Sequence, residues 1–197
     1  FSLVVMVIFS LSLSDVLSDS SVIDRVAPGL LWIAFIFAGT LGITRTFASE
    51  TENGCLEGLR LCPVESAAIY TGKAISGMCL MLVVEIVTLP VFIVLFNYSI
   101  PSIPLMAIVI LLGTAGFSVV GTLLSALTVN TRTREILLPV ILLPLLLPVL
   151  IPAVLATAKI LTGEGLFDVL TELRLMAVYD IVFFTLARLL FGHTMEG

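Results

Sequence analysis

Charged side chains are scarce in this chain. Lys, Arg, Asp and Glu make up 12% of its 197 residues, whereas 59% of the residues are hydrophobic. A soluble domain carries roughly one quarter charged residues, and so little charge could not cover the surface of a globular domain in water. The sequence therefore predicts an integral membrane protein. The net charge of −5 says little about partners, because the position of charges matters more than their sum.

The chain also lacks the motifs of several chemistries. Its nearest approach to a phosphate-binding loop, Thr71-Gly72-Lys73-Ala74, has neither the upstream glycine nor the final hydroxyl residue. We therefore expect any ATPase to be another polypeptide, and no catalytic residue stands out here. The three cysteines form no CxxC, which predicts free thiols. His193 is the only histidine, so the sequence shows no metal site and no axial ligand set for haem.

Long hydrophobic runs are what the chain does have. Continuous apolar stretches without strict alternation predict membrane-spanning helices. The six runs are residues 1–13, 26–43, 67–96, 104–127, 136–158 and 173–191. The first run is short and starts at Phe1, so we expect the first span to be truncated at its N-terminal side. The expected fold is an all-α membrane protein with six transmembrane helices in one permease domain, residues 1–197.

Basic residues favour one orientation of these spans, since cytosolic loops are enriched in Lys and Arg. If the segment after the second span is cytosolic, six basic residues fall on that side and three on the other. The cytosolic set is Arg45, Arg60, Lys73, Arg132, Arg134 and Arg188, and the outer set is Arg25, Lys159 and Arg174. This predicts that both termini are cytoplasmic.

Residues 50–62, between the second and third spans, have the pattern of a short amphipathic helix. At 100° per residue, one face holds Glu50, Asn53, Glu57 and Arg60. The opposite side holds Cys55, Leu56, Leu59 and Cys62. Pro63 would end such a helix. We interpret this segment as a cytosolic coupling helix that docks on a soluble partner. The alternative is a loop helix that only packs on the bundle.

The same segment carries a family resemblance. FASETENGCLEGLRLCPVESAAIYTGK (47–73) closely resembles a segment of the CcmB family, the membrane subunit of the haem exporter of cytochrome c maturation. APGLLWIAFIFAG (27–39), TRTREILLPVILLPLLLPVLIPA (131–153) and LRLMAVYDIVFFTLARLLF (173–191) are similar to the family as well. The E-x-G-x-L-E-x-L pattern more distantly resembles type-2 exporter permeases of the ATP-binding-cassette (ABC) class. The resemblance covers most of the chain.

The resemblance implies a permease of the bacterial inner membrane that works with a separate cytosolic ABC ATPase and with haem-handling membrane subunits. It also implies that the 47–73 segment is where the ATPase binds. Haem would then be a transported or handled ligand rather than a cofactor bound by a recognisable motif. A homodimer is one possible assembly, because two ATPase domains act together in this class, and no nucleic-acid partner is expected. The residues that we expect at the ATPase interface are Glu50, Glu52, Asn53, Gly54, Leu56, Glu57, Leu59 and Arg60.

Two acids fall inside predicted spans, Glu85 in the third and Asp180 in the sixth. A charge at the bilayer centre costs at least about 2.5 kcal/mol, so such residues are candidates for function. They would line a path, take up a proton or contact a polar part of a substrate. The alternative is a neutral acid that is hydrogen-bonded to a neighbouring helix.

Backbone features suggest where the helices bend and pack. Pro144, Pro148 and Pro152 recur every four residues in the fifth span, which predicts a kink that acts either as a hinge or as a static curve. Small residues recur at the same spacing in span two (Ala34, Ala38, Gly42) and span four (Thr114, Ser118, Thr122, Ala126), which favours close helix contacts. Leu166, Phe167, Val169, Leu170 and Leu173 suggest a helix on the outer membrane surface, or else an early start of span six.

The function is left between three alternatives. The first is a haem-exporting permease driven by the partner ATPase. The second is an ABC-type exporter of a lipid, a drug or a peptide on the same frame. The third is an assembly factor that uses ATP hydrolysis to release a haem chaperone, with nothing crossing the membrane. A polar path between spans would favour transport, and a closed bundle would favour the assembly role.

Overall fold

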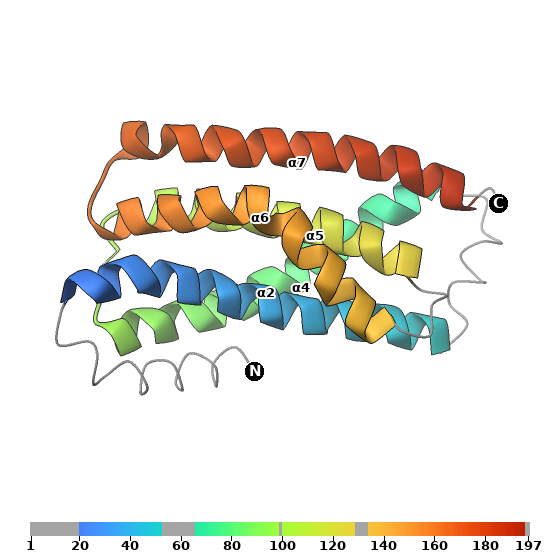
Figure 1. Ribbon diagram of the computed structural model, residues 1–197, viewed down its shortest axis with the longest axis horizontal. Coiled ribbons are helices and arrows are strands. Elements are labelled where there is room, and N and C mark those ends of the chain that lie inside the picture. Colours follow the sequence, from blue (N-terminus) through green and yellow to red (C-terminus); the bar gives the residue numbers. More distant parts are fainter. Residues whose placement is uncertain (1–19, 53–65, 99, 129–133, 196–197) are drawn as a thin grey trace.

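The computed structural model describes residues 20–52, 66–98, 100–128 and 134–195, with side chains in 26–44, 67–98, 100–128 and 137–190 (Figure 1). Every element in these ranges is a helix, which confirms the predicted all-α fold. The five helices are α2 (Ser20–Glu52), α4 (Ser66–Phe96), α5 (Ile103–Thr128), α6 (Arg134–Leu161) and α7 (Leu166–Met195).

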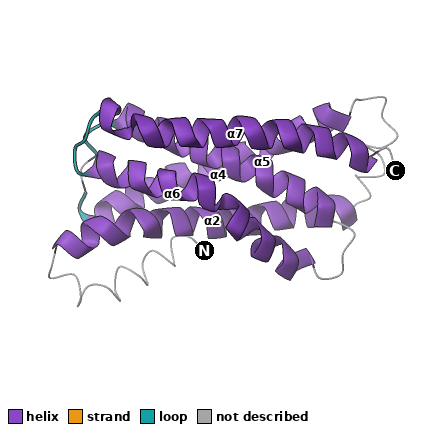
Figure 2. Cartoon of the chain, turned by 45° about the horizontal axis from the view of Figure 1, so that its top comes forward, coloured by secondary structure: helices purple, strands orange, loops and turns teal. Residues whose placement is uncertain are grey.

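The helices form a bundle in which successive helices run in opposite directions (Figures 1 and 2). Consequently the C-terminal ends of α2, α5 and α7 share one end of the bundle with the N-terminal ends of α4 and α6. The α5 helix is central, since it packs against all four of the others. Its second half is buried almost without interruption, from Gly116 to Ser125.

Four helices are long and apolar enough to cross a bilayer. Their qualifying stretches are Val26–Thr44, Ala67–Phe96, Ile103–Thr128 and Leu137–Leu161, which match the predicted second to fifth spans within a few residues. The protein is therefore a multi-pass membrane protein. The α7 helix is not among these four, although it runs the length of the bundle beside α6 (Figure 2). The first predicted span lies outside the described residues, so the count of six spans stays a prediction.

Two helices are longer than their apolar runs. The α2 helix does not end where hydropathy falls near residue 43 but continues to Glu52 as one helix. The α7 helix begins at Leu166, so the predicted separate helix on the outer surface is wrong. The alternative of an early start of the sixth helix is confirmed. The α7 helix contains no proline, and its only glycine is Gly192 near the end. No helix-breaking residue therefore separates the segment that starts at Leu166 from the apolar run that follows it.

The connection between α6 and α7 is short because α6 ends in a tight cap. Gly163 adopts a φ of 88°, a left-handed conformation that costs glycine little. Gly163 N–H donates to Ile160 O and Glu164 N–H donates to Lys159 O, which is the hydrogen-bond pattern of a Schellman motif. Asn97 ends α4 with a φ of 52° in a related way. These caps turn the chain back directly into the next helix.

The predicted small-residue stripes lie at helix contacts, and four of their seven residues are buried, whereas Ala38, Gly42 and Ala126 are half-buried. Thr114, Ser118 and Thr122 of α5 are buried toward α4. Ser118 Oγ donates to Ala74 O, and a methyl group on Gly77 would lie only 2.9 Å from Ser118 Oγ. In α2, Ala34 is fully buried, and a methyl group on Gly42 would lie 2.9 Å from Leu80 of α4. The α2–α4–α5 contacts are therefore close because these side chains are small.

Candidate functional site

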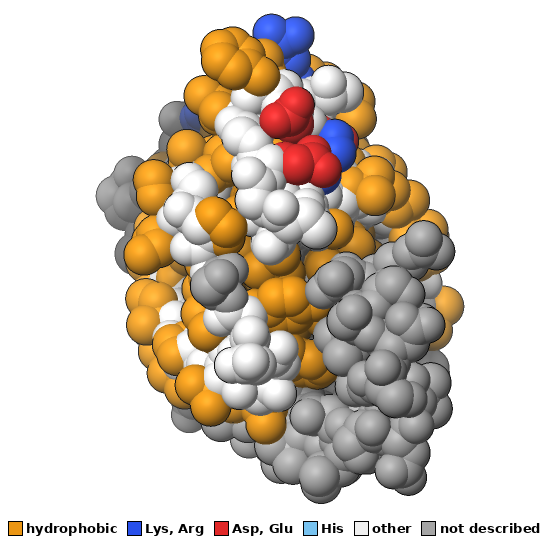
Figure 3. Space-filling model, turned by 90° about the vertical axis from the view of Figure 1, so that its left-hand side faces the viewer, with side chains coloured by type: hydrophobic (Ala, Val, Ile, Leu, Met, Phe, Trp, Pro, Cys, Tyr) orange, Lys and Arg blue, Asp and Glu red, His pale blue; other side chains and the backbone are white. Residues whose placement is uncertain are grey.

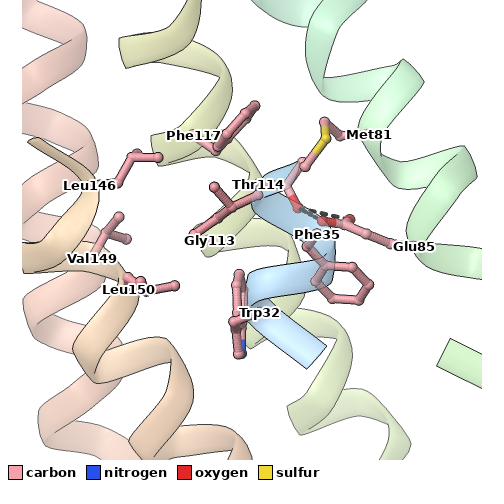
Figure 4. A pocket seen from close by; sticks show the side chains of 11 residues that line it. Trp32, Phe35, Met81, Glu85, Gly113, Thr114, Phe117, Leu146, Val149 and Leu150 are labelled. Carbon is pink, nitrogen blue, oxygen red and sulfur yellow. Dashed lines mark hydrogen bonds between the residues drawn. The ribbon is translucent and has the colours of Figure 1, made fainter. Parts of the chain in front are cut away.

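The centre of the bundle holds one buried acid, Glu85 of α4, with only 2% of its surface exposed. Its carboxyl group points at Thr114 of α5, whose Oγ1 lies 2.7 Å from Oε1 and 2.8 Å from Oε2 (Figure 4). Thr114 Oγ1 also lies 2.7 Å from its own helix carbonyl, Ile110 O. These contacts place the predicted intramembrane candidate in a hydrogen-bonded α4–α5 pair.

The Glu85 carboxyl group borders a small cavity of about 10 Å³, where four helices meet. That volume is about the room of a single water molecule. Apart from Glu85 and Thr114, the lining is apolar or aromatic, and it comprises Trp32, Phe35 and Ile36 of α2, Met81 of α4, Gly113 and Phe117 of α5, and Leu146, Val149 and Leu150 of α6 (Figure 4). In the described state this site has no room for a large ligand.

Trp32 ties three helices together beside this cavity. Its indole Nε1 donates to Thr157 Oγ1 of α6 at 3.0 Å, and its ring meets Phe35 edge to face. The ring lies so close to Gly113 of α5 that an added methyl group there would be 2.1 Å from it. Sequence reasoning did not select this tryptophan, because its partners on the other helices, Thr157 and Gly113, are far from it in the sequence.

Asp180 of α7, the second intramembrane candidate, lies on the other side of α5. Both of its carboxylate oxygens are buried, and neither has a hydrogen-bond partner among the described residues. They face Gly116 of α5, where a methyl group would lie 2.7 Å from Oδ1. The hydroxyl group of the neighbouring Tyr179 is not bonded to Asp180 but donates to Leu145 O of α6 at 2.8 Å. The structure therefore does not bring Asp180 and Glu85 into one site.

A charged cluster that sequence reasoning missed lies at the end of the bundle where α6 meets α7. Lys159 Nζ donates to Glu172 Oε1 at 2.8 Å and to Asp168 O at 2.8 Å. Figure 3 shows acidic and basic side chains next to one another on this otherwise mainly apolar and uncharged end face. Burial acts to raise the pKa of Glu172, but the hydrogen bond and the charge of Lys159 outweigh it and hold that pKa below its usual value. Lys159 and Glu172 are 13 residues apart in the sequence, so no sequence pattern indicated that they form a pair.

Comparison with known proteins identifies the family. The family model described as CcmB protein matches residues 1–197 of this chain. The chain belongs to the CcmB family.

Curated relatives of this CcmB chain carry the name heme exporter protein B. The protein of Rhodobacter capsulatus is 32% identical over 126 residues, which cover 64% of this chain and 58% of the relative. The protein of Paracoccus denitrificans is 29% identical over the same shares of both chains. The protein of Pseudomonas aeruginosa is 29% identical over 144 residues, 73% of this chain and 63% of the relative. The aligned parts thus span about three fifths of these relatives.

The predicted coupling segment of this CcmB chain is described only at its start. Glu50 and Glu52 belong to the last turns of α2, so the first three residues of the segment predicted as a separate helix are part of α2. The other interface residues, Asn53, Gly54, Leu56, Glu57, Leu59 and Arg60, lie outside the described residues. Their role stays a prediction.

The predicted kink residues lie within one helix. Pro144, Pro148 and Pro152 are all inside α6, which changes direction part-way along its length (Figure 1). Pro144 and Pro148 are exposed on the bundle surface, whereas Pro152 is buried. That these prolines cause the bend, and that it acts as a hinge, stays a prediction. Among the described residues, no group of three or more His, Cys, Asp or Glu side chains could hold a metal ion.

Proposed function

We propose that this chain is the membrane subunit of an ATP-driven ABC-type complex of the bacterial inner membrane that handles haem during cytochrome c maturation. The observation that carries this proposal is the CcmB match over residues 1–197, together with the name heme exporter protein B of its relatives. Those names favour haem over a lipid, a drug or a peptide. The partners would be a cytosolic ATPase and haem-handling membrane subunits, with a homodimer as one form of the assembly.

The shape of α2 supports a mechanical role. Its membrane-crossing stretch ends at Thr44, yet the helix continues to Glu52, which is about 12 Å farther at 1.5 Å per residue. This end carries the first two residues of the predicted ATPase interface. The same helix packs against α4, α5 and α6 inside the bundle. An ATPase that moved the end of α2 would therefore act on three other helices at once, through a single rigid element.

Such coupling requires two states of the bundle that differ in their contacts with the ATPase. In the proposed cycle, ATP-driven closure of the ATPase shifts the segment around Glu50 to Arg60. The α2 helix carries this shift to the Trp32 contacts with α5 and α6. In this proposal, the cytoplasmic end of the bundle is the one that holds Glu52, Ser66 and Arg134. Both chain termini are cytoplasmic as well.

A second function, the non-transporting assembly factor, is favoured by one observation. The central cavity of the described bundle is about 10 Å³, whereas pockets for small-molecule ligands measure roughly 300–1,000 Å³. In the assembly role, the bundle stays closed and passes ATP-driven motion to a haem-carrying partner at its side. In the transport role, it opens a path in another state of the cycle.

The docking proposal is tested by reversing charge in the coupling segment. The double variant Glu57→Arg with Arg60→Glu should lose co-purification with the ATPase and lower membrane-dependent ATP turnover at least tenfold. Glu164→Arg is the control, because Glu164 is an exposed acid at the opposite end of the bundle. It should leave both measurements unchanged. Wild-type binding and turnover in the double variant would refute docking through this segment.

A further inference from the structure

The contacts of Thr114 require more protons than its own hydroxyl group supplies. Thr114 Oγ1 lies within 2.8 Å of three oxygens, the two of the Glu85 carboxyl group and the carbonyl of Ile110. A hydroxyl group has a single proton to donate, and the Ile110 carbonyl can only accept. Threonine in a helix commonly gives its proton to the carbonyl four residues back. A lone pair of Thr114 then faces Glu85.

A proton on Glu85 satisfies this arrangement. A neutral carboxyl group donates to Thr114 Oγ1 through one of its two oxygens, and Thr114 donates to Ile110 O, so the carboxyl group and the carbonyl group each form one hydrogen bond with this hydroxyl group. With an ionised carboxylate, the single proton of Thr114 could serve either the carboxylate or the Ile110 carbonyl, and the other would face only a lone pair. An unpaired charge in so apolar a place would also be costly.

Among the residues that the structure describes, no basic side chain pairs with Glu85. The cavity is lined by residues of α2, α5 and α6, and none of them has a titratable side chain. The other lining residue of α4, Met81, has none either. The carboxyl group of Asp180, on α7, faces Gly116, two residues and hence about 200° around α5 from Thr114. It would repel a charge on Glu85, not stabilise one. The site therefore lacks the basic partner that buried carboxylates ordinarily have.

We propose that Glu85 is a proton-binding site at mid-membrane, and that its proton is held for as long as α4 and α5 stay packed. Thr114 lies near the middle of α5, far from water at either end. Ser118 and Gly77 close the α4–α5 contact one turn away. Loss of the proton would leave a buried charge that no basic group offsets, so proton release accompanies separation of the two helices. This inference goes beyond the proposed function and does not depend on an ATPase or on haem.

The proton is measured by infrared spectroscopy of the full chain in lipid nanodiscs at neutral pH. Glu85→Gln should remove one carbonyl band of a neutral carboxylic acid. The matched control is Glu172→Gln, which removes an acid that is ion-paired to Lys159 and should remove carboxylate bands instead. If Glu85→Gln also removes carboxylate bands, the proposal is overturned.

A second variant covers the case in which Glu85→Gln does not fold. Thr114→Val removes the acceptor of the Glu85 proton, so it should shift the acid carbonyl band without removing it. An unchanged acid region in a folded Thr114→Val protein would overturn the assignment of the proton.

Retention of the proton is measured by transfer into D₂O. The acid band of the wild-type protein should shift slowly, because the site is closed. Gly77→Val would press on Ser118 and part α4 from α5, and it should speed the shift at least tenfold. Gly72→Val is the control, since a side chain at Gly72 meets nothing within 4 Å. Equal rates in the two variants would refute the link between proton release and helix separation.

Discussion

The contact between Trp32 and Gly113 shows how single residues set the spacing of this bundle. Helices in lipid gain little from hydrophobic burial against one another, so close packing and interhelical hydrogen bonds hold them together. A glycine at position 113 lets the indole ring lie directly on α5, and the ring then reaches Thr157 of α6. Two helix contacts therefore depend on the absence of one side chain.

Gly113→Ala is expected to destabilise the bundle. The added methyl group would lie 2.1 Å from the Trp32 ring, so the ring must move and strain or lose its bond to Thr157. Overpacking of this kind costs about 1–3 kcal/mol, which thermal unfolding in detergent would record as a lower Tm. Gly72→Ala is the control, because its methyl group meets nothing and helix propensity favours alanine there by about 0.5–1 kcal/mol. A Tm for Gly113→Ala at or above that of Gly72→Ala would contradict the packing argument.

At the scale of elements, the turn between α6 and α7 combines a backbone cap with an ion pair. The Gly163 cap reverses the chain, and Lys159 then joins Glu172 and the backbone of Asp168 across the turn. Glu172 is largely buried, with 8% of its surface exposed. Its second oxygen, Oε2, has no partner among the described residues. The pair therefore orients the start of α7 against the end of α6.

The contribution of this pair should depend on pH. Since the folded-state pKa of Glu172 is lowered, its stabilising effect is present above the unfolded value of about 4.3 and is lost as pH falls through the lower folded value. Glu172→Gln should therefore lower the Tm at pH 7, and the gap to wild type should close in acid below about pH 4. Glu164→Gln, at an exposed acid in the same turn, should show a smaller gap. A gap for Glu172→Gln that persists unchanged in acid would contradict the ion-pair assignment.

The sequence was sufficient for the apolar elements and insufficient where helices leave the lipid. Runs such as Ala67–Phe96 end sharply in polar or turn-forming residues, so hydropathy located them within a few residues. Hydropathy reports the surrounding solvent rather than backbone hydrogen bonding. It therefore could not show that α2 continues through Arg45 to Glu52, where the chain has neither proline nor glycine. For the same reason, hydropathy could not show that Leu166 belongs to one continuous helix with the rest of α7.

The sequence was also sufficient for some candidate site residues and insufficient for others. An acid within a long apolar run is conspicuous, so the sequence alone indicates Glu85. Its partner Thr114 appeared only as a member of a small-residue stripe, because the pairing depends on how α4 and α5 are rotated against each other. Gly116 and Thr157 carried no signal either, since they matter only through Asp180 and Trp32.

At the scale of the whole molecule, α2 joins the start of the predicted ATPase contact to the interior. It reaches from Ser20 to Glu52 and packs on α4, α5 and α6. The α5 helix, in contrast, packs against all four of the other described helices and ends at Thr128. Motion that enters at the coupling segment therefore has a continuous helical route to the Trp32 contacts, whereas α5 forms the frame against which α2 would move.

An insertion of three glycines between Thr46 and Phe47 is expected to uncouple the complex. Glycine lowers helix stability by about 1 kcal/mol per residue, so the insertion would break the rigid path while leaving the coupling segment intact. Co-purification with the ATPase should persist, but membrane-dependent ATP turnover should fall toward that of the isolated ATPase. The same insertion after Gly163, in the α6–α7 turn, is the control and should leave turnover unchanged. Wild-type turnover with the insertion at residue 46 would show that force does not pass along α2, and loss of co-purification would show that docking itself depends on the rigid attachment of the segment to α2.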